Sequence, residues 1–223
     1  MTPALPTGCV IAMLGAESTG KTELARAIAG RLQARGLAAT LVGEYLREWC
    51  DREGRTPRPD EQAAIAAEQT RRIAEAATRG VVVADTTALM TAVYSDMLFN
   101  DAGLYATALK AQSGYAITLL TALDVPWVGD GLQRDGPHVR VPVDARVRAA
   151  LTDARLPFSV IHGLGRERLS NAWNAIHAIA DRSDPVRDTR RSGAGNAAWS
   201  WPCEKCSDPA CEHQLFTALL AKR

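Results

Sequence analysis

The sequence has few aromatic side chains, almost no net charge and no long apolar run. Phe, Trp and Tyr make up 5% of the 223 residues, and 26 basic against 25 acidic residues leave a formal charge of +1. Proteins that bind a nucleic-acid backbone usually carry a clear basic surplus, so the balance argues against that class. No apolar stretch approaches the roughly 20 residues that span a bilayer, and residues 1–8 lack the features of a signal peptide. We therefore expect a cytoplasmic protein whose partners are neither nucleic acid nor membrane.

The cysteines give poor evidence for a disulfide framework. There are five, an odd number, and Cys203, Cys206 and Cys211 lie close together near the C-terminus. Cys9 lies in an apolar run and Cys50 follows a tryptophan, so both are expected to be small core residues. At this length folding buries roughly 70% of the unfolded chain's surface, which is enough for a core without disulfides.

Short apolar runs alternate with segments of helical periodicity. The expected strands are 9–14, 38–42, 81–84, 116–120 and 158–161, and the expected helices are 21–35, 60–79, 88–98, 104–112, 144–154 and 166–180. Residues 129–143 are rich in glycine, proline and charge, which favours a loop. The alternation predicts an α/β fold, a five-stranded parallel sheet with helices on both faces. We expect this domain to cover residues 1–182, followed by a solvated linker at 183–200 and a small Cys-rich tail at 201–223.

The segment GAESTGKT at 15–22 fits the nucleotide-binding P-loop pattern and lies between a predicted buried strand and a predicted helix. Glycines let successive backbone N–H groups point at phosphates, and the helix that follows presents the positive end of its dipole to the same anion. Lys21 is expected to reach the terminal phosphates, and the hydroxyl of Thr22 to bind the Mg²⁺ that accompanies ATP. The residues expected to bind the nucleotide are Gly15, Glu17, Ser18, Thr19, Gly20, Lys21 and Thr22. This motif predicts a P-loop NTPase fold.

Two carboxylates follow predicted strands at the edge of the sheet where reacting groups gather. Glu44 comes after the second strand, and Asp85 ends the third, VVVAD, as in a magnesium-organising Walker B segment. Transfer of a phosphoryl group to a hydroxyl needs a carboxylate that accepts the proton, distinct from the one near the metal. We favour Asp85 near Mg²⁺ and acceptor and Glu44 as an acceptor-site carboxylate. The exchanged assignment stays open, as do a solvated carboxylate for Glu44 and a helix cap for Asp85.

With these pieces in place the chain resembles the nicotinamide riboside kinase domain of the NadR type. The resemblance is carried by GAESTGKTELARAIA at 15–29, GEYLREW at 43–49, VVVADTTALMTAVYSDMLF at 81–99 and DVPWVGDGLQRDG at 124–136. It implies ATP-dependent phosphorylation of the ribose 5′-hydroxyl of nicotinamide riboside, giving the mononucleotide that feeds NAD synthesis. The sequence departs from the family at Ala16, where proline is common, and in its Cys-rich tail. We also expect no adenylyltransferase domain, because only eight residues precede the first predicted strand.

A nicotinamide ring is flat and cationic, so its pocket is expected to offer aromatic faces and carboxylates. The aromatic candidates near predicted strand ends are Tyr45, Trp49, Tyr94 and Trp127, and the carboxylate candidates are Glu44 and Asp130. Core or rim packing is the alternative for each aromatic residue. Arg134, in the 129–143 loop, is the candidate for a mobile guanidinium that stabilises charge as the phosphoryl group moves; an ordinary solvated arginine is its alternative.

The tail places three thiols and an imidazole within a short segment. Cys203, Cys206, Cys211 and His213 form the set that tetrahedral zinc takes, and four protein ligands make such a site structural. Free cysteines and a redox pair at Cys203 and Cys206 are the alternatives.

Two hypotheses follow for the whole chain. The first is a kinase that uses Mg²⁺ and ATP to phosphorylate a nucleoside, with nicotinamide riboside as the leading substrate. The second is a regulatory ATPase or nucleotide switch whose zinc tail recruits a protein partner. Both hypotheses fit the fold, because P-loop domains occur in kinases and in regulatory ATPases.

Overall fold

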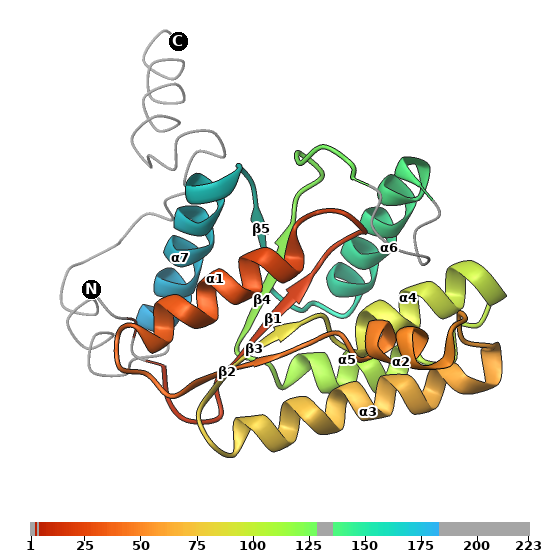
Figure 1. Cartoon of the computed structure of the whole chain (residues 1–223), viewed down its shortest axis with the longest axis horizontal. Coiled ribbons are helices and arrows are strands. Elements are labelled where there is room, and N and C mark those ends of the chain that lie inside the picture. The colour runs from red at the N-terminus through yellow and green to blue at the C-terminus, as the bar shows by residue number, and fades with distance from the viewer. Residues whose placement is uncertain (1–2, 4, 129–135, 183–223) are drawn as a thin grey trace, which may run out of the picture. The chain divides into compact units, whose positions relative to one another are not determined.

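The computed structural model describes residues 3, 5–128 and 136–182, and these form a three-layer α/β domain (Figure 1). In chain order the elements are β1 (Val10–Leu14), α1 (Lys21–Gln33), β2 (Ala39–Val42), α2 (Tyr45–Glu53), α3 (Pro59–Ala77), β3 (Val81–Asp85), α4 (Ala88–Phe99), α5 (Tyr105–Ser113), β4 (Ile117–Thr121), the short 3₁₀ helix η1 (Pro137–Val139), α6 (Arg140–Asp153), β5 (Ser159–Ile161) and α7 (Gly165–Arg182). The five expected strands are confirmed within two residues at each end.

The sheet is entirely parallel, with the strand order β2-β3-β1-β4-β5. Strands β1 and β3 are therefore neighbours at its centre, and Met13 is in register with Asp85. Because both strands run the same way, the loop after β1 and the carboxylate that ends β3 lie side by side. This topology brings the predicted P-loop and the predicted Walker B aspartate to one site.

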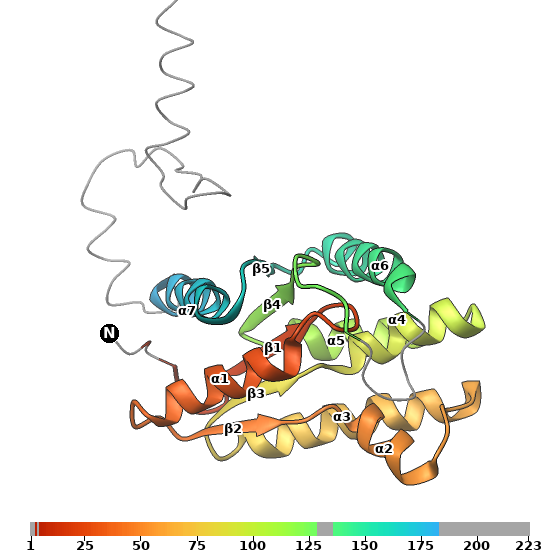
Figure 2. The same cartoon turned by 45° about the horizontal axis from the view of Figure 1, so that its top comes forward.

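Helices cover both faces of the sheet, as expected, and Figures 1 and 2 show the layers. On one side α1 and α7 pack against alternate strand residues such as Ile11 and Met13. On the other, α3, α4, α5 and α6 pack against the intervening residues, among them Val10 and Leu14. Strands β1, β3 and β4 are buried along their whole length, as parallel strands covered on both faces are.

Cys9 and Cys50 are free and buried, which confirms the expectation that they are core residues. Burial raises the pKa of each thiol to about 11, and for Cys50 the charges of Asp51 and Glu44 add to the effect. Both thiols therefore stay protonated at neutral pH.

Two expectations for the helices were wrong. Helix α2 was not predicted, because its nine residues are mostly charged and only Trp49 and Cys50 are buried, against Ile65 of α3. Its apolar residues Tyr45, Leu46, Trp49 and Cys50 recur at helical spacing, but nine residues contain too few turns for that period to stand out in the sequence. Helix α6 begins at Arg140, inside the segment expected to be a loop, and Pro142 is tolerated because it lies in the first turn, where N–H groups have no helical partner.

The predicted linker and tail, residues 183–223, lie outside the described residues. Within the described part of the chain, no helix is both long and apolar enough to cross a membrane.

Candidate active site

The loop after β1 has the backbone that a P-loop requires. Gly15 has φ +144°, and a Cβ there would lie 2.1 Å from Oγ1 of Thr121 on the adjacent strand β4. Gly20 caps α1 in the left-handed region, with φ +72°, and no side chain caps the helix. The N–H groups of the first turn of α1 are thus left for an external anion, and the helix dipole favours a negative one.

The two glycines should respond differently to alanine. We expect Gly15→Ala to lower the free energy of unfolding by about 3 kcal/mol or more, because the new methyl group meets Thr121 and the backbone is strained. Gly20→Ala should cost about 1 kcal/mol, because nothing lies within 4 Å of its Cβ and only the strain applies. Urea denaturation of both variants measures the difference, and equal losses would contradict this picture of the loop.

Hydroxyl groups hold the loop in shape. Oγ1 of the fully buried Thr19 donates to the carbonyl of Ala16 at 2.8 Å and lies 2.7 Å from Oγ1 of Thr121. Oγ of Ser18 donates to the carbonyl of Val128 at 2.9 Å and accepts from the amide of the same residue at 2.8 Å. The loop is therefore tied to the segment that follows β4, and the side chain of Thr19 serves the loop rather than a ligand.

Lys21 stands at the start of α1 with its ammonium group folded over the loop. Its Nζ donates to the carbonyl of Ala16 at 2.7 Å, so the charge is held at the concave side of the P-loop. A bound triphosphate offers the same group several charged oxygens, and a hydrogen bond between two ions is stronger than one between an ion and a neutral carbonyl.

Asp85 fits the metal role predicted for it. It is 3% exposed at the end of β3, and its Oδ1 has no hydrogen-bond partner among the described residues. A buried carboxylate oxygen without a partner is costly, and hard cations such as Mg²⁺ prefer such ligands. The residues present therefore fit Mg²⁺ with ATP: Asp85 and Thr22 would hold the ion beside the P-loop, and the ion would neutralise phosphate charge.

This interpretation predicts that Asp85→Asn weakens the binding of Mg²⁺ and nucleotide without destabilising the ligand-free protein. The nucleotide-free variant should melt no lower than the wild-type protein, because the substitution neutralises a buried carboxylate whose Oδ1 finds no partner among the described residues. The rise in melting temperature that Mg²⁺ and a non-hydrolysable ATP analogue give the wild-type protein should be largely lost. Thermal scans with and without ligand measure both effects, with Asp60→Asn, on an exposed side chain of α3, as the control. A lower melting temperature without ligand, together with an unchanged ligand effect, would contradict the assignment.

Glu44 lies after β2 at the N-cap of α2, with its side chain 15% exposed and paired with Arg47 at 3.2 Å. The backbone on either side of it is fixed by the buried Gln69 of α3. Oε1 of Gln69 accepts from the amide of Tyr45 at 2.7 Å, and Nε2 donates to the carbonyl of Gly43 at 3.2 Å. The glutamine thus sets the position of the carboxylate relative to the sheet.

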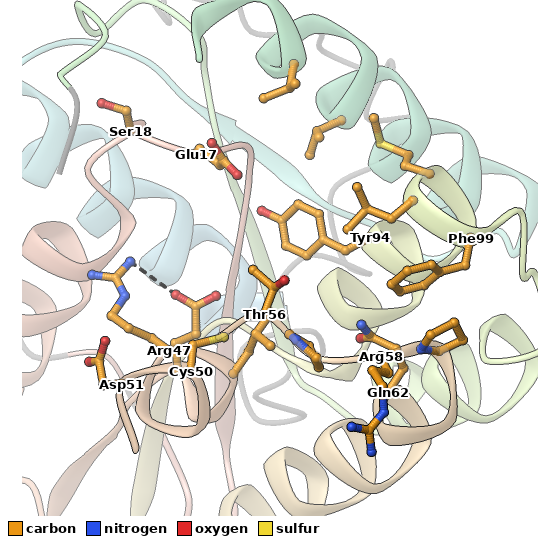
Figure 3. Close-up of a pocket in the computed structure, with 18 of the residues that line it drawn as sticks. Glu17, Ser18, Arg47, Cys50, Asp51, Thr56, Arg58, Gln62, Tyr94 and Phe99 are labelled. Carbon is orange, nitrogen blue, oxygen red and sulfur yellow. Dashed lines mark hydrogen bonds and ion pairs between the residues drawn. The ribbon is translucent and has the colours of Figure 1, made fainter. Parts of the chain in front are cut away.

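A pocket of about 880 Å³ extends from the P-loop between α2, the start of α3, α4 and the start of α6 (Figure 3). The P-loop contributes polar groups at one end, and the far wall is largely apolar. The lining residues are Glu17, Ser18, Lys21, Glu44, Leu46, Arg47, Cys50, Asp51, Thr56, Pro57, Arg58, Pro59, Gln62, Tyr94, Met97, Leu98, Phe99, Val139 and Val143. Its volume and mixed lining are those of a small-molecule site.

The structure brings some of the expected substrate residues together and not others. Glu44 and Tyr94 line the pocket, whereas Tyr45, Trp49 and Trp127 do not. Trp49 is 9% exposed and packs in the core between α2 and α3, which agrees with core packing, the alternative to a substrate contact. The guanidinium carbon of Arg72 lies over the ring of Tyr45, 4.3 Å from the centroid of that ring.

Several predicted residues lie outside the described part of the chain. These are Asp130 and Arg134 and the proposed zinc ligands Cys203, Cys206, Cys211 and His213. Among the residues that are described, no group of three or more His, Cys, Asp or Glu is placed to hold a metal ion.

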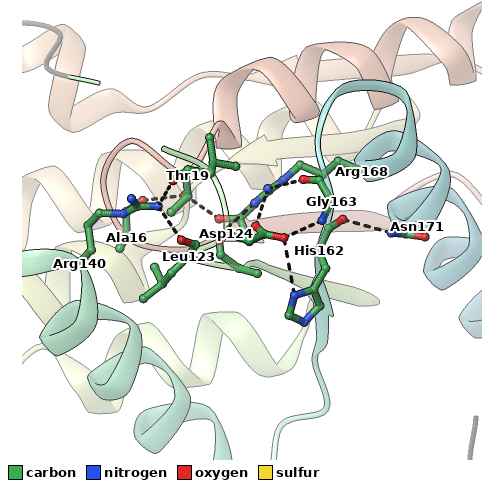
Figure 4. Close-up of polar contacts among 12 residues, drawn as sticks. Ala16, Thr19, Leu123, Asp124, Arg140, His162, Gly163, Arg168 and Asn171 are labelled. Carbon is green, nitrogen blue, oxygen red and sulfur yellow. Dashed lines mark hydrogen bonds and ion pairs between the residues drawn. The ribbon is translucent and has the colours of Figure 1, made fainter. Parts of the chain in front are cut away.

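Two buried arginines that the sequence analysis did not select fix the segment after β4 (Figure 4). Arg140 of α6 donates to the carbonyls of Leu123 and Val125, and Arg168 of α7 donates to Ala122 and to Oδ1 of Asp124 at 3.0 Å. Burial acts to raise the pKa of Asp124, but the amide of Gly163 and the charge of Arg168 together lower it. The segment that leads to Val128, and so to Ser18, is held from both sides.

A parallel sheet with this strand order, a P-loop after its central strand and a buried aspartate beside that loop define a P-loop nucleotide-binding protein. The chain belongs to the AAA domain family, whose model matches residues 10–168. A search of curated proteins finds no match.

Two of the solved structures that share the fold are forms of the NadR protein. The NadR protein in complex with NR is 21% identical with a TM-score of 0.62, and the match covers 78% of this chain and 51% of that one. The NadR protein in complex with NAD and AMP-PNP is 18% identical with a TM-score of 0.60, and covers 87% of this chain and 52% of that one. This chain thus spans about half the length of each, and the fold expected from the NadR resemblance is confirmed.

Proposed function

We propose that the protein is an ATP-dependent nucleoside kinase and that nicotinamide riboside is its acceptor. The observation that carries the proposal is the continuity of the pocket with the P-loop. Lys21 and Ser18 belong to both, so a hydroxyl bound in the pocket lies next to the terminal phosphate of a nucleotide bound on the loop. A switch ATPase needs the loop but not a pocket of this size beside it.

The residues divide the work in a simple way. The P-loop amides and Lys21 bind and orient the triphosphate and stabilise the charge that develops during transfer. Glu44, on the pocket wall, orients the acceptor hydroxyl and accepts its proton. Thr22 and Asp85 would hold Mg²⁺, which would further neutralise the phosphates when bound.

The acceptor end of the pocket supports a nucleoside rather than a nucleotide. Two arginines line it among the described residues, and both are already compensated, since Arg47 pairs with Glu44 and Arg58 pairs with Glu61 at 2.9 Å. An acceptor that already carried a phosphate would compete with these carboxylates. The NadR neighbour, solved in complex with NR, agrees with a riboside acceptor.

The test is an assay of purified protein with Mg²⁺, ATP and a panel of ribosides, with mass spectrometry of the products. We expect ADP and the monophosphate of nicotinamide riboside in equal amounts. Hydrolysis of ATP at the same rate with and without every riboside, with no monophosphate product, would overturn the proposal in favour of a regulatory ATPase.

A further inference from the structure

Two buried glutamines on α3 differ in their hydrogen bonding. Gln62 and Gln69 are each 2% exposed, and their spacing of seven residues puts them on the same face of the helix. Gln69 bonds the backbone on both sides of Glu44. The side chain of Gln62 makes no hydrogen bond within the described residues, and its Oε1 is buried without a partner.

Such a group needs an explanation. A buried amide without a partner costs about 1–3 kcal/mol, and the large majority of buried polar side-chain atoms in folded proteins are paired. An aliphatic residue of the same size would pack in this position without that cost. Gln69 has a structural role, because its side chain hydrogen-bonds the backbone on either side of Glu44. The side chain of Gln62 makes no such bond within the described residues.

The position of Gln62 indicates where its partner comes from. It lines the pocket beside the P-loop, and Figure 3 shows it away from Glu17 and Ser18, with Tyr94 between them and Phe99 on its own side. A ligand whose reacting hydroxyl faces the P-loop therefore presents its opposite end to Gln62. Two aromatic rings line the pocket along that path and suit a flat heterocycle.

We propose that Gln62 recognises an amide edge on the ring of the acceptor, a carboxamide with an N–H donor beside a C=O acceptor. The inference rests on the proposed function and adds the residue that determines which acceptor the kinase prefers. The carboxamide of glutamine offers one donor and one acceptor in the same arrangement, and rotation about its terminal bond presents either to the ligand. A carboxylate on the ring would accept from the nitrogen but leave the oxygen of Gln62 without a donor. The nearby Arg58 does not favour a carboxylate either, because Glu61 and Asp60 already compensate it.

The test compares three ribosides as acceptors: nicotinamide riboside, its carboxylate analogue and pyridine riboside, which has no substituent. For the wild-type protein we expect kcat/KM to be at least about tenfold higher for the carboxamide than for the other two. In Gln62→Leu the value for the carboxamide should fall by about tenfold, and the three acceptors should come within a few-fold of one another. The melting temperature of the ligand-free variant should be unchanged or higher, because an unpaired polar group is removed.

Gln69→Leu is the matched control on the same helix face. It removes real hydrogen bonds, so it should lower the melting temperature and reduce kcat/KM for all three ribosides by the same factor. If Gln62→Leu behaves like this control, Gln62 is structural and the inference is wrong. If the wild-type protein uses the three ribosides equally, Gln62 does not determine specificity, and the inference is wrong although the proposed kinase activity is supported. If the wild-type protein phosphorylates none of them, the proposed function fails and the inference with it.

Discussion

Lys21→Ala should reduce phosphoryl transfer by about a thousandfold while leaving the protein folded. The ammonium group sits over the P-loop and would meet the charge that builds up on the transferred group, where the loss of one well-placed donor typically costs 10²–10³ in rate. The hydrogen bond to Ala16 comes from a charged donor and is worth about 1.5–3 kcal/mol, a loss that still leaves a domain of this size folded. Initial rates of ADP and monophosphate formation, with melting curves alongside, measure both effects.

Two variants sharpen this prediction. Lys21→Arg keeps the charge but replaces a compact ammonium with a planar fork, so it should restore only part of the rate. Lys110→Ala, on the exposed side of α5, should behave as wild type. If Lys21→Ala transfers phosphate at close to the wild-type rate, the P-loop assignment is wrong.

Glu44→Gln should lower kcat by about 10²–10⁴, the usual contribution of a general base, with little change in the affinity for ATP. The substitution keeps the size of the side chain and its place at the start of α2 but removes the group that takes the proton. Its contact with Arg47 is partly exposed, so the fold should be almost unaffected. Rapid-quench measurement of the transfer step, with nucleotide affinity measured separately, tests the prediction.

Glu48→Gln is the natural control, because Glu48 lies on the same helix and pairs with Arg72 but does not line the pocket. It should keep nearly all of the wild-type kcat. If Glu44→Gln instead loses the response to Mg²⁺ while Asp85→Asn loses transfer but keeps that response, the two carboxylates have the exchanged roles.

The sequence was enough to predict the sheet and the phosphate-binding loop. Buried parallel strands leave continuous apolar runs, such as VIAML and VVVAD, and the P-loop depends on residue types at fixed spacing. Both signals are local. Asp85 was predicted because it ends such a run.

The acceptor pocket was harder to predict, because it is built by packing between distant segments. Trp49 and Tyr94 look equally suitable in the sequence, yet Trp49 packs against Ile65 and Tyr94 lines the pocket. A signal for Gln62 and Gln69 was present: both fall on the buried stripe of α3, where apolar residues are expected. The sequence did not show that only one of them finds partners in the fold.

The most direct test of the account is calorimetric titration of nicotinamide riboside into protein already saturated with Mg²⁺ and a non-hydrolysable ATP analogue. The account predicts saturable binding at a single site, weakened by Gln62→Leu and retained in Glu48→Gln. If the analogue binds but no riboside does, the pocket beside the P-loop is not an acceptor site and the central claim is contradicted.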